Sequence, residues 1–472
     1  MWDLLKFKNN VAIIDEFGSR VTYGDVEEKG RELADAVDGR CLVFSLCRNS
    51  IGSVIGYITF INNGIVPVML NANLEKELLK KLLDSYRPKY IWIPTEQVAE
   101  FSSWKAIYSS FDYTLLCTSY EEQFPLFDDL ALLLTTSGST GSPKFVRQSY
   151  TNISENTKSI VEYLKLDHTE RPITTLPMNY TYGLSIINSH FMVGATLLLT
   201  DKSLMQKEFW KFFRDNGATS FGGVPYTYEM LKRLRFMKME LPTLRTMTQA
   251  GGKLTAELHE EFAKYAVENK KNFVVMYGQC EATARMGYLP PDKAVQKKGS
   301  MGIAIPGGSF ALIDAMGNEV TESYVTGELV YKGPNVTLGY AESGEDLVKG
   351  DERGGILQTG DMAQFDDDGY FYIVGRKKRF LKIYGNRVNL DEMERMVKGS
   401  FEDINCACAG VDDHMYLFIT DESMIEEIKE FVVKKTKLNA KAFHIMAIDK
   451  IPQNDAGKTL YKELEKYYEG SV

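Results

Sequence analysis

The residues best suited to chemistry form one short run, TTSGSTGSPK, from Thr135 to Lys144. Its glycines and small hydroxyl residues allow backbone amides and side-chain hydroxyls to surround phosphate oxygens, and Lys144 adds a positive charge. The run follows an apolar, strand-like segment, ALLL. It lacks the Walker A spacing, because Pro143 stands where that loop requires glycine before the lysine. We therefore predict a phosphate-binding loop of another kind, against the simpler interpretation of a flexible glycine-serine linker.

Five further runs of possible functional residues follow in order along the chain. They are LPMNYTYGL at 176–184, QAGGKL at 249–254, YGQCEAT at 277–283, QTGD at 358–361 and IPQNDAGKTL at 451–460, and weaker runs lie at 21–34, 62–71, 327–340 and 375–394. In this order, from about residue 21 to residue 460, the runs resemble those of the adenylate-forming (AMP-binding) enzyme superfamily. That superfamily includes acyl-CoA synthetases, nonribosomal peptide adenylation domains and luciferases. A single run could arise by chance, whereas the ordered set makes coincidence negligible.

The resemblance implies that ATP and Mg²⁺ activate a carboxylic acid, with an acyl adenylate and pyrophosphate as products. Attack of a carboxylate on the α-phosphate brings two anions together, so such a site must neutralise charge. By resemblance, Lys458 bridges the substrate carboxylate and the α-phosphate, Glu281 positions the metal ion, and Lys144 holds the departing pyrophosphate. The loop residues expected to assist Lys144 are Thr136, Ser137, Gly138, Ser139, Thr140 and Gly141. Taken alone, Lys458 would be interpreted as a surface lysine and Glu281 as an acid at a helix start.

The resemblance also implies contacts to the nucleoside from three of these runs. QAGGKL would cover adenine, the tyrosine of YGQCEAT would pack its ring on adenine, and the aspartate of QTGD would hold the ribose hydroxyls together with an arginine. The residues concerned are Gly251, Gly252, Tyr277, Gly278, Gln279, Cys280, Asp361 and Arg376. The family motif has threonine at the position of Cys280, and a thiol donates a weaker hydrogen bond than a hydroxyl. We expect lowered rather than abolished activity from this difference.

A second half-reaction, attack of a thiol on the acyl adenylate, would use another face of a small C-terminal domain. In the family that domain rotates about an Asp or Lys three positions after the glycine of a Gly-Arg pair, which is Lys378 here. The same alignment assigns Lys382 to the second conformation and places Gly385 near the thiol tunnel. The simpler interpretation of the run 376–382, RKKRFLK, is a solvated basic segment or a nucleic-acid patch. The implied thiol is coenzyme A or the phosphopantetheine of a separate carrier protein, and no feature of the sequence decides between them.

The acyl pocket is assigned to residues of LPMNYTYGL, of FGGVP and around YGQCEAT. These residues are Tyr180, Thr181, Tyr182, Gly183, Phe221, Gly222, Met276 and Met286. Aromatic rings and flexible methionines suit an apolar or aromatic acid of modest size. Many acyl-CoA synthetases have a histidine at the position of Tyr180, so an aromatic ring is retained there. Amino-acid activators have an aspartate near the position of Thr181, and we therefore expect an acid without an α-amino group.

The elements that must position these residues follow a pattern of alternation. Through about the first 370 residues, apolar β-rich runs such as TTLPM, TSFGGV and NFVVMYG alternate with longer stretches of helical spacing, which predicts α/β layers. From 302 to 372, short strands broken by glycines predict a small antiparallel β-barrel or sheet. The fold class is thus α/β, with a large N-terminal domain of layered sheets and helices at 1–375 that includes this small β-barrel subdomain. A small, mobile α+β lid domain is expected at 376–472.

Composition excludes several classes of protein. A hydrophobic fraction of 44% and a charged fraction of 25% are typical of a soluble globular chain, and a net charge of −9 argues against a nucleic-acid-binding surface. The most apolar stretch, 51–68, is interrupted by two asparagines and a glycine, so we predict a buried helix and strand rather than a membrane span. The N-terminus carries Asp3 and Lys6 where a secretion signal needs an apolar core, and a cytoplasmic location is expected.

The cysteines indicate neither a disulfide framework nor a zinc site. Their positions, 41, 47, 117, 280, 406 and 408, lack the paired spacing of either arrangement, so we predict reduced thiols. Cys406 and Cys408 lie in the apolar run INCACAGV and are predicted to be small buried strand residues.

Three rival functions stay open beside acid–thiol ligation. An amino-acid-activating enzyme that loads a separate carrier protein would share the first half-reaction. A non-catalytic member that only binds nucleotide is suggested by Cys280. A P-loop kinase or GTPase is opposed by the loop spacing and would release ADP or GDP rather than AMP. Because no carrier-domain motif follows Lys458, a stand-alone ligase is expected, whose acid, acceptor and oligomeric state the sequence does not specify.

Overall fold

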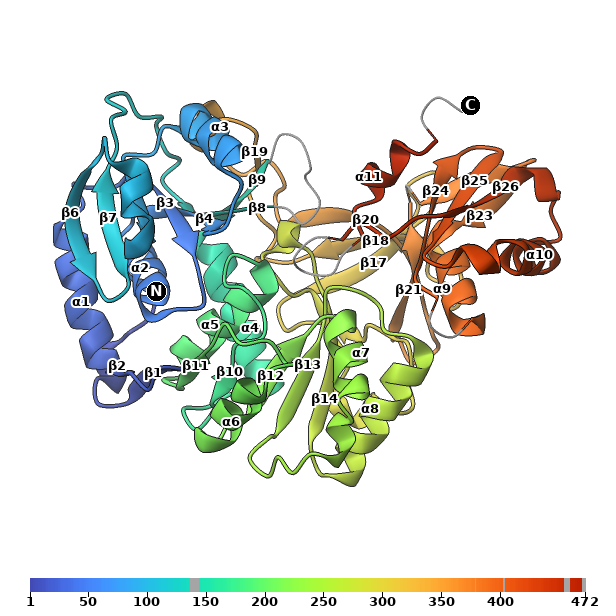
Figure 1. Cartoon of the computed structure of the whole chain (residues 1–472), viewed down its shortest axis with the longest axis horizontal. Coiled ribbons are helices and arrows are strands. Elements are labelled where there is room, and N and C mark those ends of the chain that lie inside the picture. Colours follow the sequence, from blue (N-terminus) through green and yellow to red (C-terminus); the bar gives the residue numbers. More distant parts are fainter. Residues whose placement is uncertain (136–143, 378, 402–403, 454–458, 469–472) are drawn as a thin grey trace.

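The computed structural model describes residues 1–135, 144–377, 379–401, 404–453 and 459–468. Figure 1 shows a large body, coloured from blue to yellow, and a smaller C-terminal body in orange and red. Two large sheets, covered by helices, build the large body within the described ranges, and a four-stranded sheet lies next to the C-terminal body.

The central strands of the first sheet are apolar along almost their whole length, because both faces of the sheet are buried. Strands β3, β4, β5 and β8 run parallel, and β9 and β19 extend one edge in antiparallel fashion. Along the sheet the order is β19 (Gly339–Ala341), β9 (Phe145–Ser149), β8 (Leu130–Thr135), β4 (Val66–Asn71), β3 (Leu42–Cys47), β5 (Tyr90–Pro94), β7 (Tyr113–Cys117) and β6 (Lys105–Ser110).

Helices α1 (Tyr23–Asp35), α2 (Ile51–Asn62) and α3 (Lys76–Tyr86) accompany this sheet. A capping box between Thr22 and Asp25 begins α1, as its sequence suggests. The predicted buried helix of the stretch 51–68 is α2, and one hydrophobic cluster joins it to side chains of both large sheets.

The second sheet consists mainly of parallel strands and carries most of the predicted site runs. Its order is β16 (Ile303–Ala304), β15 (Gly287–Tyr288), β14 (Asn272–Tyr277), β13 (Thr246–Gln249), β12 (Ser220–Gly223), β10 (Pro172–Ile173), β11 (Leu197–Leu199), β1 (Val11–Asp15) and β2 (Arg20–Thr22). The accompanying helices are α4 (Tyr150–Leu164), α5 (Thr181–Met192), α6 (Lys207–Asp215), α7 (Pro225–Arg233) and α8 (Ala256–Glu268).

The glycine-rich region forms the expected antiparallel strands. They are arranged as β17 (Ser309–Ile313), β18 (Gly327–Lys332), β20 (Ile356–Phe365) and β21 (Phe371–Arg376). Short 3₁₀ helices lie at Leu5–Phe7, Thr95–Phe101, Phe236–Lys238, Cys280–Ala282, Pro291–Lys293, Gly344–Val348, Glu422–Met424 and Ala440–Ala442.

The C-terminal body has hydrophobic clusters of its own, whose members all follow residue 380. Its elements are β22 (Phe380–Ile383), β23 (Asn386–Asn389), α9 (Leu390–Ser400), β24 (Cys406–Val411), β25 (His414–Ile419), α10 (Ile425–Thr436), β26 (Phe443–Ala447) and α11 (Tyr461–Glu465). Cys406 and Cys408 are fully buried on β24, as predicted. The α/β fold class is confirmed, whereas a domain boundary at residue 376 stays a prediction.

No helix in the described ranges combines the length and the hydrophobicity that crossing a membrane requires. The apolar stretch 51–68 instead forms α2 and the beginning of β4, which are both buried.

Candidate active site

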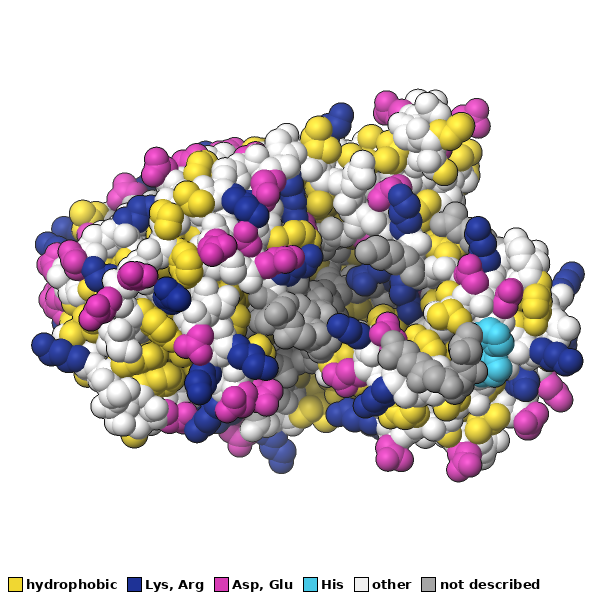
Figure 2. Space-filling view, turned by 90° about the horizontal axis from the view of Figure 1, so that it is seen from above, with side chains coloured by type: hydrophobic (Ala, Val, Ile, Leu, Met, Phe, Trp, Pro, Cys, Tyr) yellow, Lys and Arg dark blue, Asp and Glu magenta, His cyan; other side chains and the backbone are white. Residues whose placement is uncertain are grey.

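The predicted site runs meet at the carboxyl ends of neighbouring parallel strands. YGQCEAT continues β14, QAGGKL continues β13, and LPMNYTYGL follows β10 on the way into α5. Ligands of open α/β sheets bind at such carboxyl ends. Figure 2 shows the surface hollowed between the two bodies, with dark-blue Lys and Arg side chains beside the hollow.

One corner of the site brings Lys144 and Glu281 to the same tyrosine. The Tyr340 hydroxyl donates a hydrogen bond of 2.6 Å to Glu281 Oε1, and Lys144 Nζ lies 3.8 Å from the centroid of the Tyr340 ring. Tyr340 reaches this position because β19 pairs with β9, which follows Lys144 directly. Burial and the nearby Glu281 charge raise the pKa of Tyr340 well above its usual value, which keeps its hydroxyl a donor. Arg353 adds a cation 4.7 Å from the same ring centroid.

Sequence reasoning missed Tyr340 and Arg353 as site residues. Tyr340 closes the run 327–340, which is only a weak match, and Arg353 lies in none of the runs. Arg353 donates to the backbone carbonyl of Glu281 at 2.9 Å and thereby fixes the position of this residue. The predicted loop residues 136–141 and Lys458 lie outside the described residues.

The fit of Mg²⁺ to this corner depends on a single carboxylate. Within the described ranges, no group of three or more acidic, His or Cys side chains could hold a metal ion. Mg²⁺ at nucleotide sites is usually bound by one or two carboxylates together with phosphate oxygens and water. Glu281 offers such a carboxylate, so the residues fit this ion in the company of a nucleotide.

A second corner is built around Asp361. Asp361 Oδ2 accepts hydrogen bonds from the Tyr277 hydroxyl at 2.5 Å and from Gln279 Nε2 at 2.9 Å. Arg376 lies opposite Asp361 in the pairing of β20 and β21, and its Nε is 3.6 Å from Asp361 Oδ1. Burial raises the pKa of Asp361 above its ordinary value. The structure thus joins three runs that are far apart in sequence into one polar cluster suited to hydroxyl groups.

Two glycines keep space open beside these corners. Gly251 has a φ of +84°, which favours glycine, and a Cβ there would lie 2.8 Å from the Tyr180 hydroxyl. A Cβ on Gly278 would lie 1.8 Å from the carbonyl oxygen of Ala284, a backbone atom that cannot move aside. Gly252 follows in the same loop, and Cys280 is buried at the start of the 3₁₀ turn after Gly278.

The residues predicted to line the acyl pocket divide between several hydrophobic clusters. Tyr182, Met276 and partly buried Tyr180 share one cluster, and a Cβ on Gly222 would meet the Tyr182 hydroxyl at 2.9 Å. The Tyr182 hydroxyl is also within 2.8 Å of the Thr248 hydroxyl. The remaining residues lie around this cluster: Gly183 packs on the backbone of Pro177, and Phe221 and Met286 belong to two neighbouring clusters.

Thr283 marks a sharp turn in the run YGQCEAT. Its φ is 67°, a strained value for a β-branched residue. Hydrogen bonds hold this conformation: the Thr181 hydroxyl donates to the Thr283 carbonyl, and the Thr283 hydroxyl donates to the Asn335 carbonyl at 2.7 Å. The turn separates Glu281, beside Tyr340, from Arg285, which points to the acyl-pocket side.

Arg285 is a buried wall residue that sequence reasoning also missed. Its Nε donates to Ser185 Oγ at 3.1 Å and its Nη1 to the Tyr163 hydroxyl at 3.0 Å. Its guanidinium carbon lies 5.3 Å from the centroid of the Tyr182 ring, and Met276 Sδ is also in contact. The only signal in the sequence is a charged residue directly before Met286 in an otherwise apolar segment.

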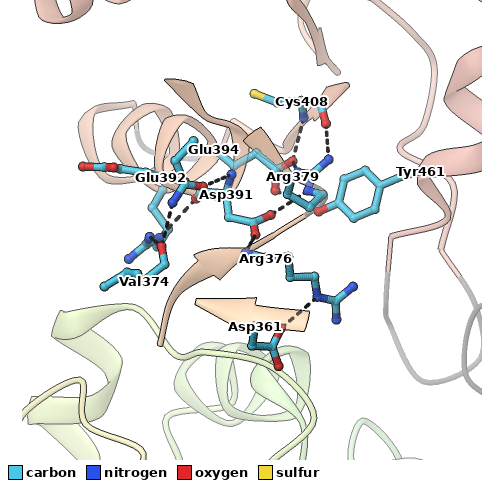
Figure 3. A network of polar contacts seen from close by, with 11 residues as sticks. Asp361, Val374, Arg376, Arg379, Asp391, Glu392, Glu394, Cys408 and Tyr461 are labelled. Atoms are coloured by element: carbon cyan, nitrogen blue, oxygen red, sulfur yellow. Dashed lines mark hydrogen bonds and ion pairs between the residues drawn. The ribbon is translucent and has the colours of Figure 1, made fainter. Parts of the chain in front are cut away.

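A network of ion pairs connects the end of β21 to the C-terminal body, as Figure 3 shows. Arg379 pairs with Asp391 at 2.8 Å and with Glu394 at 2.5 Å, and its guanidinium carbon lies 3.7 Å from the Tyr461 ring centroid. The Tyr461 hydroxyl donates to Glu394 at 3.0 Å. The backbone N–H of Arg376 donates to Asp391 at 3.3 Å.

Three predicted residues belong to this junction. Lys378 lies outside the described residues. Lys382 is exposed on β22, and Gly385 occupies the hairpin turn before β23 with a φ of +84°. Neither of these two described residues contacts the corners around Glu281 and Asp361 in the recorded hydrogen bonds and ion pairs.

Comparison with a protein-family profile gives a match to "AMP-binding enzyme" over residues 2–341. Among curated proteins, 2-succinylbenzoate–CoA ligase of Bacillus licheniformis is 29% identical over 347 residues, which cover 71% of this chain and 70% of the relative. Oxalate–CoA ligase of Saccharomyces cerevisiae is 26% identical, with 97% and 94% of the two chains covered. The chain spans 66% of the length of oxalate–CoA ligase of Arabidopsis thaliana, at 28% identity.

Solved structures share the fold over nearly the whole chain. O-succinylbenzoate coenzyme A synthetase of Bacillus subtilis, in complex with AMP, has a TM-score of 0.80 at 21% identity and covers 98% of both chains. The anthranilate CoA ligase AuaEII, in complex with anthranoyl-AMP, has a TM-score of 0.79 at 20% identity and covers 100% of this chain and 98% of its own.

Proposed function

This chain belongs to the AMP-binding enzyme family, and from that premise we propose that it is an AMP-forming ligase that joins a carboxylic acid to coenzyme A. The acid carboxylate attacks the α-phosphorus of ATP, a P–O bond to pyrophosphate breaks, and an acyl adenylate forms. The thiol of coenzyme A then attacks the acyl carbon, and AMP leaves. The observation that carries this proposal is the convergence of Lys144, Tyr340 and Glu281 on one side of the strand ends with Asp361 and Tyr277 on the other.

The two corners divide the work of binding ATP. Asp361, which already accepts two hydrogen bonds, holds the ribose hydroxyls, and Arg376 stands beside it. Lys144 and Arg353 supply positive charge near the Tyr340 ring for the phosphates. Glu281 would hold Mg²⁺, and the ion would supply positive charge to neutralise the phosphates. Lys458, which lies outside the described part of the chain, neutralises the approaching carboxylate.

The domain arrangement supports a two-step cycle. We assign the large domain to residues 1–375 and the lid to 376–472, because the hydrophobic clusters of the C-terminal body contain only residues after 380. Rotation of the lid about Lys378 would move Lys458 away from the active site and bring the face with Lys382 and Gly385 to it. This face would admit the thiol of coenzyme A.

The acid is expected to lack an α-amino group. Thr181 lies near the position where amino-acid activators have an aspartate, and its hydroxyl donates a hydrogen bond to the Thr283 carbonyl. The nearest charged group on this wall is Arg285, which would repel an ammonium. An amino-acid activator that loads a carrier protein is the alternative, and it shares the first half-reaction.

The function is tested by the products that the purified protein forms from ATP with panels of fatty, aryl and amino acids. We expect AMP and pyrophosphate only when an acid is present, and a CoA thioester when coenzyme A is added. Lys458→Ala should lower the rate of adenylation about 100- to 1000-fold, since one preorganised charge at the transition state is lost. Lys462→Ala, an exposed lysine on α11, is the matched control and should behave like the wild type.

Other products would contradict the proposal in different ways. Release of ADP would indicate a kinase, and activity with amino acids alone would support the alternative substrate class. Equal activity of the Lys458→Ala and Lys462→Ala proteins would remove Lys458 from the mechanism.

A further inference from the structure

Arg285 differs from every other buried charged residue in the described ranges. It is 2% exposed and makes no recorded ion pair with a described carboxylate. The other two buried arginines are paired: Arg147 with Glu352, and Arg379 with Asp391 and Glu394. The buried acids are paired as well, namely Glu170 with Arg245, Glu328 with Lys377, Asp361 with Arg376 and Asp366 with Lys297. Among the described residues, Arg285 is therefore the one buried charged side chain without an ion-pair partner.

Burying an unpaired cation is unfavourable by several kcal/mol or more, and arginine cannot avoid this by losing its proton. The partners of Arg285 are neutral: Ser185 at Nε, and Tyr163 and Met276 at Nη1. The Tyr182 ring gives only weak compensation through its face. Nη2 donates no hydrogen bond to a described residue. Its N–H groups can therefore donate to a ligand.

The guanidinium is held in place by a rigid surrounding. The backbone carbonyl of Arg285 accepts hydrogen bonds from Asn156 at 2.8 Å and from Asn335 at 3.1 Å. Asn156 belongs to α4, whose start is fixed by a capping box between Ser149 and Asn152. A preorganised guanidinium matches a planar carboxylate through two parallel hydrogen bonds. Its neighbours Tyr182 and Met276 belong to the cluster assigned to the acyl pocket.

We infer that Arg285 binds a second carboxylate of the substrate, so that the acid activated by this enzyme is a dicarboxylate. This inference rests on the proposed function, because it requires the acyl group to lie against Tyr182 and Met276. One carboxylate reacts with ATP on the side of Glu281, and the other pairs with Arg285 on the far side of the Thr283 turn. The aromatic and methionine walls contact the carbon body between them.

The first test compares matched acids with the wild-type protein. The pairs are hexanoate with adipate, and benzoate with each of the three benzenedicarboxylate isomers. The monomethyl ester of each diacid serves as an analogue whose second carboxyl group carries no charge. We expect at least one diacid to give a kcat/KM for AMP formation about 100-fold above both its monoacid and its monoester, as for a lost charge-assisted hydrogen bond. Equal or better use of the monoacids and monoesters would overturn the inference and leave the proposed ligase intact. If no acid of any class releases AMP, the proposed function fails first.

The second test uses substitutions of Arg285 with an arginine control elsewhere. Arg285→Met keeps the side-chain length without the charge and should lower the diacid-to-monoacid ratio of kcat/KM about 100-fold, while Arg285→Lys should restore part of this ratio. Arg31→Met, on the exposed face of α1, should not change the ratio.

A stability measurement separates a binding role from a structural one. Without ligand, Arg285→Met should unfold at the same or a higher temperature than the wild type, because an unpaired buried cation is removed. The diacid with AMP should raise the midpoint of the wild type more than that of the variant. A lower midpoint, together with an unchanged diacid-to-monoacid ratio, would show that Arg285 only stabilises the fold.

Discussion

The Asp361 carboxylate is buried beside Tyr277 and Gln279, and this burial raises its pKa. A carboxyl group whose pKa is higher in the folded than in the unfolded protein binds more protons when folded. Stability therefore falls as the pH rises from the ordinary value of 3.8 through the raised value, and the full penalty is present above it. At neutral pH the ionised carboxylate of Asp361 therefore lowers stability, and nucleotide binding is the role that we propose for it.

Asp361→Asn should separate these two effects at the level of one residue. We expect ATP to bind about 10- to 100-fold more weakly, because a charged acceptor for the ribose is lost. The thermal midpoint at neutral pH should stay equal or rise, since the penalty of the buried charge disappears. Calorimetric titration and thermal unfolding measure the two quantities, with Asp367→Asn in the exposed turn after β20 as the control. A lower midpoint with unchanged ATP affinity would refute this assignment.

Whether a single site residue can be predicted from the sequence depends on whether its role is visible in a short run or only in contacts with distant residues. Glu281, Asp361 and Tyr277 stand in short runs whose order along the chain resembles that of the family, so this resemblance marks them as candidates, although their individual roles still await tests. Arg285 could not be predicted in this way, because the lack of a counter-ion becomes visible only when all of its neighbours are known. The position of Tyr340 in the site depends on the pairing of β19 with β9, and no local sequence pattern predicts this pairing.

At the level of elements, apolar runs predicted strands such as β12 and β14, but not which strands lie next to them in the sheet. The alternation of strand and helix indicated α/β layers, and the structure confirms them, with parallel strands at the centre of both large sheets. Sequence patterns did not show that β10 lies between β11 and β12, or that the sheet continues to β1 near the N-terminus. Strand order follows from which faces the helices cover, and this depends on contacts between distant segments.

The junction between β21 and α9 gives a prediction at this level. Arg379→Ala would leave the buried Glu394 and the partly exposed Asp391 without their cation. We expect the unfolding free energy of the C-terminal body to fall by about 3–5 kcal/mol, as for one partner removed from a buried ion pair. Urea unfolding followed by circular dichroism measures the change. Lys434→Ala, exposed on α10, should shift the same transition by less than about 0.5 kcal/mol, and an equal shift in both variants would contradict this role.

At the level of the whole molecule, the hydrophobic clusters formed by the described residues contain either only residues before 376 or only residues after 380. The sequence predicts a domain boundary near residue 376 from the change of pattern at the basic run, and both this boundary and the rotation between the two half-reactions stay predictions. The family profile ends at residue 341, and the likeness of the C-terminal body to known proteins rests on longer matches, such as the one to oxalate–CoA ligase of Saccharomyces cerevisiae and those to solved structures.

Lys378→Pro should separate the two half-reactions of the whole enzyme. Proline fixes φ near −65° and removes the backbone N–H, so a rotation at this position would be hindered. We expect formation of the CoA thioester to slow about tenfold or more, while formation of acyl adenylate and pyrophosphate changes much less. Single-turnover measurements of both products test this, with Lys378→Ala as the control for loss of the side chain. Equal slowing of both steps would argue against a hinge at this residue.

The pairing of β9 with β19 has a consequence for how the protein is made. Arg147 on β9 donates to the backbone of Tyr340, which lies 193 positions later, and forms its ion pair with Glu352. During synthesis the ribosome has therefore to release the chain past residue 352 before β9, which already has β8 on one side, gains β19 on the other and Arg147 gains Glu352. Until then the nascent chain exposes an unpaired sheet edge, the kind of surface that chaperones protect.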